Sequence, residues 1–176
     1  MFKKILIVLA VVLLALIIVI ATRPADFTIT RSAVLNAPPA TVFEQVNDYH
    51  KWLAWSPWAK MDPAMKQTFD GPASGTGASY AWEGNSQVGS GRMTITDSQP
   101  AKLVAMRLEF LKPFTATNQA EFTFVPDGTG TKVTWTMTGK NNFMSKACGL
   151  VMDMDKLIGA DFEKGLSNLK EIAEKK

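Results

Sequence analysis

Residues 102–111 read KLVAMRLEFL, and residues 115–125 (TATNQAEFTFV) and 132–140 (KVTWTMTGK) show the same alternating pattern. In each stretch apolar side chains alternate with polar ones such as Arg107, Glu109 and Glu121. Alternation with a period of two predicts strands that have one buried face and one face in water. The buried face would carry Val104, Met106, Leu108 and Phe110 from the first strand, Ala120, Phe122 and Phe124 from the second, and Val133, Trp135 and Met137 from the third.

Four further strands are predicted outside this stretch. Residues 27–36, 66–70, 79–83 and 92–97 are short runs rich in β-branched or aromatic residues. Glycine- and proline-containing turns separate those that follow residue 66, as in Gly71-Pro72 and Gly84-Asn85. Short turns between successive strands predict an antiparallel meander. Between the first and second strands, residues 41–58 have helical spacing and predict two short helices.

The pattern changes to a helical one near the C-terminus. Apolar residues recur every three or four positions, with charged residues between them, and they are Val151, Met154, Ile158, Phe162, Leu166, Leu169 and Ile172. This spacing predicts one long amphipathic helix, and its apolar stripe would cover the apolar face of the sheet. The predicted fold class is α+β, with a seven-stranded antiparallel sheet and a long C-terminal helix.

The N-terminus carries a different signal. From Ile5 to Ala21, seventeen consecutive residues are Ile, Leu, Val or Ala. As a helix this run is about 25 Å long, and its neighbours extend it to membrane thickness. We therefore expect a transmembrane anchor at residues 1–22, a linker at 23–26 and one domain at 27–176.

The flanking charges predict the orientation of this anchor. Lys3 and Lys4 precede the apolar run and only Arg23 follows it closely, which favours a cytoplasmic N-terminus and an extracytoplasmic domain, periplasmic in a bacterium. A cleaved signal peptide is the alternative, because Val19-Ile20-Ala21 would suit a signal peptidase. We favour retention, since the apolar run exceeds the roughly 7–15 residues of a signal peptide.

Composition argues against several functional classes. Lys and Arg exceed Asp and Glu by 19 to 16, but without Lys3 and Lys4 the count is 17 to 16, and no basic cluster predicts nucleic-acid binding. His50 is the only histidine and Cys148 the only cysteine. These two residues do not make a usual zinc site, no Gly-x-Ser-x-Gly motif is present, and the glycine pairs lack the spacing of phosphate-binding loops. We expect no catalytic residue, no metal and no cofactor.

Local motifs support a family resemblance. They include residues 33–39 (AVLNAPP), the segment Trp55-Ser56-Pro57-Trp58, residues 80–85 (YAWEGN) and Gly89-Ser90-Gly91. With the order of elements, they resemble the START-like, helix-grip superfamily often called SRPBCC, in its polyketide cyclase/dehydrase and lipid-transport branch. The resemblance implies a curved seven-stranded sheet that grips the C-terminal helix around an apolar cavity. Members bind lipids, sterols, hormones or polyketides, and a minority catalyse cyclisation or dehydration.

The apolar phases of the strands and of the last helix supply candidates for the cavity wall. Methionine adapts to ligands of variable shape, and a tryptophan N–H can orient a polar head group. An ordinary core with methionine as a gap filler is the alternative interpretation. The candidates are Trp82, Met106, Leu108, Phe122, Phe124, Trp135, Met137, Met154 and Ile158.

Three functions remain open from the sequence. The first is a membrane-anchored, extracytoplasmic binding module for a lipid or another hydrophobic small molecule. The second is an enzyme of the polyketide cyclase/dehydratase type that acts in the same cavity. The third is a partner-binding domain whose cavity is filled by its own side chains, and a cavity smaller than about 300 Å³ would favour it.

Overall fold

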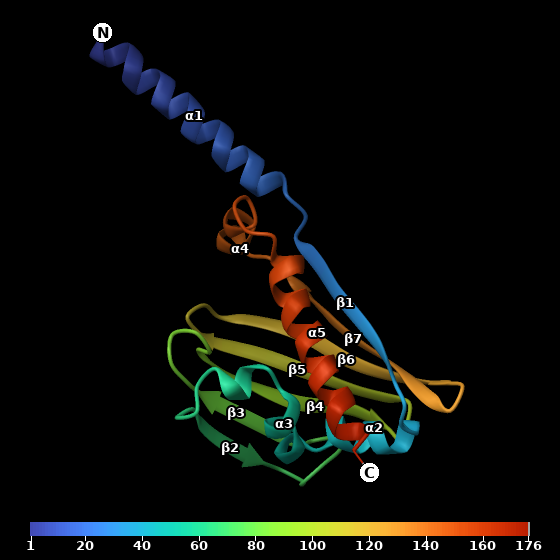
Figure 1. Cartoon of the computed structure of the whole chain (residues 1–176). Helices are drawn as coiled ribbons and strands as arrows, with labels where there is room; N and C mark the ends of the chain where they lie inside the picture. Colours follow the sequence, from blue (N-terminus) through green and yellow to red (C-terminus); the bar gives the residue numbers. More distant parts are fainter. Residues whose placement is uncertain (176) are drawn as a thin grey trace.

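In the computed structural model, which describes residues 1–175, helices cover one face of a single sheet and a further helix projects away from it (Figure 1). The helices are α1 (Phe2–Thr22), α2 (Pro39–Asn47), α3 (Tyr49–Trp55), the 3-10 helix η1 (Trp58–Lys60), α4 (Phe143–Cys148) and α5 (Met154–Ala173). The strands are β1 (Asp26–Leu35), β2 (Lys66–Asp70), β3 (Ser79–Glu83), β4 (Ser90–Gln99), β5 (Leu103–Lys112), β6 (Ala116–Asp127) and β7 (Gly130–Lys140).

The sheet confirms the predicted antiparallel meander. Its strand order is β1-β7-β6-β5-β4-β3-β2, so β2 to β7 follow one another and β1 closes the far edge beside β7. The β1–β7 register runs from Asp26 opposite Lys140 to Leu35 opposite Thr131. Because the last strand, β7, pairs with β1, the first two strands of the domain, β1 and β2, form the two edges of the sheet.

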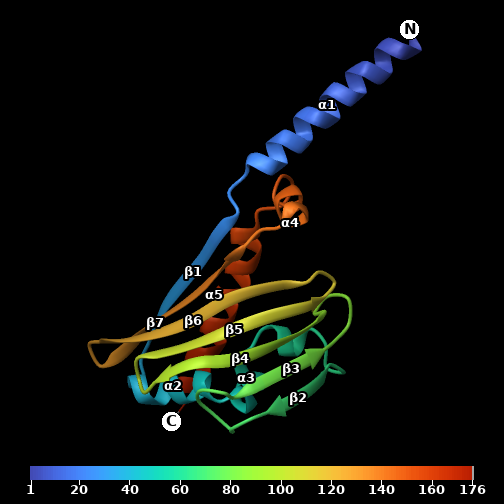
Figure 2. The ribbon, with the colours of Figure 1, turned by 180° about the vertical axis from the view of Figure 1, so that it is seen from behind.

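Helix α5 lies across the concave face of the sheet (Figure 1), whereas the opposite face carries no helix (Figure 2). The inward residues of β6 and β7 are buried, as the alternation predicts, and their outward neighbours face solvent. Helices α2 and α3 pack beside α5. The Asn168 side chain donates a hydrogen bond of 2.9 Å to the carbonyl of Trp55, which fixes α5 against α3. The predicted helix-grip architecture is confirmed.

An aromatic column joins the helix to the sheet. The ring of Phe162 stacks on Trp135 with 4.0 Å between centroids and 4° between planes. Trp135 in turn stacks on Phe122 at 4.6 Å. Gly165 brings the helix close to this column, since a Cβ at that position would lie 2.9 Å from the Trp135 ring.

Helix α1 has 21 residues with a mean hydropathy of 3.5, and only Ile20 is buried. It is the one helix of residues 1–175 that is long and apolar enough to cross a membrane, a property it shares with signal sequences. Its C-terminal end touches α4. Lys146 Nζ donates to the Ala21 carbonyl at 3.3 Å, and Arg23 donates to the Gly149 carbonyl at 2.9 Å.

The segment before α5 differs from the sequence-based expectation. The long helix was expected to include Val151, but it begins at Met154 because Asp153 caps it by accepting a hydrogen bond from the Lys156 N–H. Upstream, Asn142 caps the six-residue helix α4, which the sequence did not predict. Val151 therefore lies in a loop and is highly exposed.

We predict that Phe162→Ala lowers the free energy of unfolding by about 3–5 kcal/mol, because it removes a buried ring from the column and leaves a cavity. Phe162 is only 2% exposed. The matched control is Lys164→Ala on the exposed side of α5, expected to change stability by less than about 0.5 kcal/mol. Urea unfolding of both variants tests this, and equal effects would contradict the packing of α5.

Candidate functional site

A cavity of about 950 Å³ opens where α5 separates from the sheet near α1. Its walls come from β1, from β5, β6 and β7, from α4 and the loop after it, and from the first turns of α5. The apolar side chains in the wall include Ile29, Phe110, Met137, Leu150, Met154 and Ile158. The volume lies in the range of roughly 300–1,000 Å³ typical of small-molecule sites.

The structure brings three of the nine candidate wall residues to this cavity, namely Met137, Met154 and Ile158. The other candidates lie elsewhere in the core. Five are buried within it and Leu108 packs against it half-buried. The five buried residues are Trp82, Met106, Phe122, Phe124 and Trp135.

The N–H groups of the two candidate tryptophans, Trp82 and Trp135, do not line this cavity. Trp82 Nε1 donates to the Val88 carbonyl at 3.3 Å. Trp135 Nε1 is buried and has no hydrogen-bond partner in residues 1–175. Trp135 is instead surrounded by rings, because Trp52, Trp55 and Trp58 contact it edge-on in addition to the aromatic column.

Asn118 is a polar lining residue that was not among the candidates. It is buried on β6, and its Nδ2 lies 3.8 Å from the Met137 sulfur, its one hydrogen-bond partner in the described chain. Sulfur is a weak acceptor, so the amide keeps capacity for a ligand. Gly139 makes room for it, since a Cβ there would overlap the Asn118 side chain. Asn118 lies at an inward position of β6, in alternation with Ala120 and Phe122. A polar residue at an inward position is the signal by which the sequence could have identified it.

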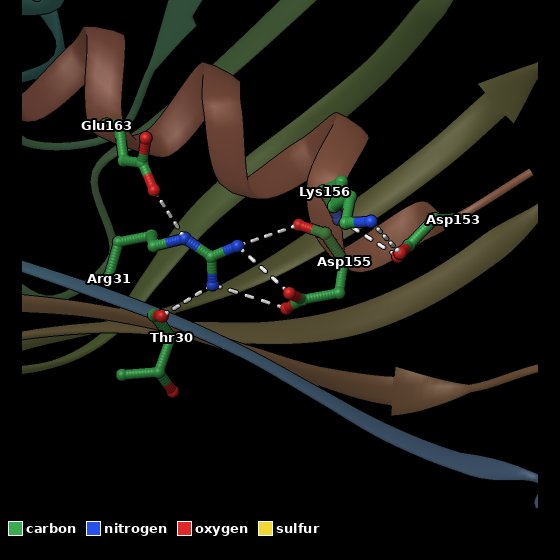
Figure 3. Close-up of polar contacts among 6 residues, drawn as sticks. All are labelled: Thr30, Arg31, Asp153, Asp155, Lys156 and Glu163. Atoms are coloured by element: carbon green, nitrogen blue, oxygen red, sulfur yellow. Dashed lines mark hydrogen bonds and ion pairs between the residues drawn. The ribbon is translucent and has the colours of Figure 1, made fainter.

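An ionic clamp formed by Arg31, Asp155 and Glu163 ties the first turns of α5 to β1 (Figure 3). Arg31 Nε donates to Glu163 at 2.8 Å, and Nη1 and Nη2 donate to the two Asp155 carboxylate oxygens at 3.2 and 3.0 Å. The backbone carbonyls of Asp155 and Thr30 accept two further bonds from the same guanidinium. These bonds satisfy the planar fork of the arginine, which a lysine would not do.

The clamp depends on a close approach of the helix. A Cβ on Gly159 would overlap the Arg31 guanidinium, so glycine at this position allows the side chain to lie against α5. The hydrogen bond to Asp155, reinforced by Glu163, raises the pKa of Arg31. The Lys156 N–H donates a hydrogen bond to the capping Asp153 carboxylate at the start of the helix, and this bond lowers the pKa of Asp153.

The residues considered for chemistry lie apart from one another. His50 is in the first turn of α3, where Nδ1 lies 3.0 Å from Asp48 and the ring stacks on Phe69 at 4.2 Å. Cys148, partly buried at the end of α4, lines the large cavity. Residues 1–175 contain no group of three or more His, Cys, Asp or Glu side chains able to share a metal ion.

We predict that Arg31→Met loosens the first turns of α5. Amide hydrogen exchange at residues 158–161 should become several-fold faster, while residues 166–169 below the clamp keep their wild-type rates. Arg92→Met, which breaks the exposed Arg92–Asp70 pair far from α5, is the control and should leave both segments unchanged. Unaltered exchange at 158–161 in Arg31→Met would show that the clamp does not hold the helix.

Comparison with solved structures supports the same fold. Protein CV1439 from Chromobacterium violaceum superposes with a TM-score of 0.62 at 14% identity, over 85% of this chain and 98% of that one. The Aha1 dimer from Colwellia psychrerythraea gives 0.61 at 15% identity, over 84% and 96%. The di-domain ARO/CYC BexL from the BE-7585A biosynthetic pathway gives 0.63 at 14% identity, over 90% of this chain and 53% of that one.

At these identities the structural matches establish the fold alone, and a search of curated protein sequences gave no significant match. A family model described as "Polyketide cyclase / dehydrase and lipid transport" matches residues 26–174, which include every strand of the sheet and all of α5. The chain therefore belongs to the polyketide cyclase/dehydrase and lipid-transport family.

Proposed function

We propose that this protein is a membrane-anchored, extracytoplasmic module that binds a lipid or another hydrophobic small molecule in the cavity. The observation that carries the proposal is the position of a 950 Å³, largely apolar cavity beside the end of a helix with the length and hydropathy of a membrane span. Family membership supports it, because the family description includes lipid transport.

The lining suits an amphipathic ligand. Met137 and Met154 offer flexible, polarisable side chains on opposite walls, and Ile29 and Ile158 complete an apolar surface for a hydrocarbon body. Asn118 supplies one buried polar group within this surface. A small number of polar groups in a mostly apolar wall is typical of sites that orient a ligand without reacting with it.

The charged groups in the lining favour binding over catalysis. The acidic lining residues Asp26, Asp153 and Asp155 are exposed, and so are Arg23 and Lys140. Lys146 is partly buried, and its ammonium group donates to the Ala21 carbonyl. Asp153 and Asp155 are in addition held in ion pairs with Lys156 and Arg31. A general acid or base with a tuned pKa would instead need to be partly desolvated near the reacting atoms. We therefore rank the cyclase-like enzyme below the binding module.

The orientation of the domain rests on the charges that flank α1. Lys3 and Lys4 precede the apolar helix, and Arg23 is the only basic residue that follows it closely. The bias towards basic residues on the cytoplasmic side predicts a cytoplasmic N-terminus. The cavity would then face the extracytoplasmic compartment.

We predict that the folded domain, residues 23–176, binds Nile red at one saturable site. Met137→Ala should weaken binding by at least roughly fourfold, because losing the contact of even one buried methylene costs about 0.8 kcal/mol and 1.4 kcal/mol corresponds to tenfold. Thr138→Ala, its exposed neighbour on the other face of β7, is the control and should have little effect. Fluorescence titration measures both. A folded domain that takes up no probe, lipid or sterol would favour the partner-binding alternative.

We also predict the topology in the cell. Alkaline phosphatase fused to the C-terminus should be active, since the enzyme matures only outside the cytoplasm, and the fusion should stay with membranes after alkaline washing. Replacing Lys3 and Lys4 with glutamate should reduce this activity, whereas replacing Lys132 and Lys140 on β7 should not. Release of a chain that begins near Thr22 would identify a cleaved signal peptide and contradict the anchor.

A further inference from the structure

Exposed apolar side chains gather at the end of the domain next to α1. Six of them form what we call the apical patch, contributed by α4, the loop after it and the first turn of α5. The patch consists of Phe143, Met144, Val151, Met152, Met154 and Leu157. Exposed apolar patches of this kind on a soluble domain mark contact with another apolar surface.

The patch lies at the point where α1 leaves the domain. Figure 1 shows α4 between the C-terminal end of α1 and the top of α5. Lys146 and Arg23 bond α4 and its loop directly to the end of α1, and Ile20 is buried there. Phe114, in the β5–β6 turn, is also exposed and lines the same cavity as Met144 and Met154. A surface entered by α1 would therefore meet the apical patch first.

The charges around the patch are complementary to an anionic lipid surface. Arg23, Lys140 and Lys146 line the cavity at this end, and Arg23 and Lys146 bond to neutral backbone carbonyls, so their charges stay uncompensated. Of the acidic lining residues, Asp153 and Asp155 are paired with Lys156 and Arg31. Asp26 is the remaining acidic side chain. An apolar surface rimmed by basic residues is the arrangement of peptides that lie in a membrane interface.

We propose that the apical patch docks onto the bilayer that holds α1, so that the cavity opens at the membrane surface. This inference rests on the proposed membrane anchoring. Residues of the patch, Met144, Val151, Met152 and Met154, line the cavity themselves. A lipid that enters between them passes from the bilayer to the cavity without crossing water, and the anionic part of its head group meets Arg23 and Lys146 at the rim.

Hydroxyl-radical footprinting of the full chain in nanodiscs tests the docking without any substitution. Met144, Met152 and Met154 are 54, 47 and 38% exposed, and Met61 after η1 is 40% exposed, so a free patch would be oxidised at rates similar to Met61. In discs of phosphatidylcholine and phosphatidylglycerol that hold one chain each, we expect the three patch methionines to be oxidised several-fold more slowly than Met61. Rates equal to that of Met61 would overturn the proposal.

The loading of one chain per disc excludes protection by a second copy. Failure of the chain to enter discs at all, seen by size-exclusion chromatography, would instead contradict the anchor itself and with it this inference. A chain that does not enter the discs is therefore distinguishable from an anchored chain whose patch stays in water.

A pair of matched variants gives a second test. Val151→Asp introduces a charge into the patch and should restore fast oxidation of Met152 and Met154. Val125→Asp places the same charge at an exposed site on β6, far along the sheet, and should leave them protected. Both sites are exposed, so neither change should alter the thermal unfolding midpoint. Protection that persists in Val151→Asp would argue against docking through this patch.

Discussion

The stacking of Phe162 on Trp135 is the contact on which the remaining architecture depends. The two rings lie parallel at 4.0 Å, and Phe122 continues the column into the sheet. A long helix laid on a curved sheet does not stay equally close to it along its whole length. The aromatic column sets one place of close approach, and Gly165 permits it. Below the column the apolar faces of helix and sheet fill the core, with Leu166 and Leu169 buried.

Above the column the same geometry leaves a cavity. Ile158 lies one turn before Phe162, and Met137 lies two residues after Trp135, yet both line the cavity. Ile158 is only partly buried against the core, so apolar packing holds the helix less firmly at this end than the aromatic column does. Arg31 supports this end of α5 by tying it to β1 with directional bonds to Asp155 and Glu163. The clamp fixes the position of α5 without filling the cavity, since Arg31 does not line it.

The sequence predicted the class of fold well because alternation and helical spacing are local signals. It could not separate the solid core from the cavity wall. Trp135 and Met137 share a strand and a face, and only the crossing point of α5 decides that one is packed and the other lines the cavity. Asn118 and Arg31 were visible in principle as polar residues in inward phases. The helical spacing of apolar residues extends back to Val151 and therefore predicts helix there. Helix α5 begins only after the Asp153 cap, whose hydrogen bond depends on side-chain geometry.

In the proposed arrangement, the anchor and the apical patch hold the domain at the membrane together. Six partly exposed side chains alone would hold a domain on a membrane only weakly. Once α1 is in the bilayer, however, docking becomes an intramolecular event, because a short linker keeps the patch at high effective concentration beside the surface. Arg23 and Lys146 shorten this tether further by bonding the end of α1 to α4. A weak patch is then sufficient, and a weak patch has an advantage for transfer, since the domain can lift away from the bilayer as a ligand enters or leaves.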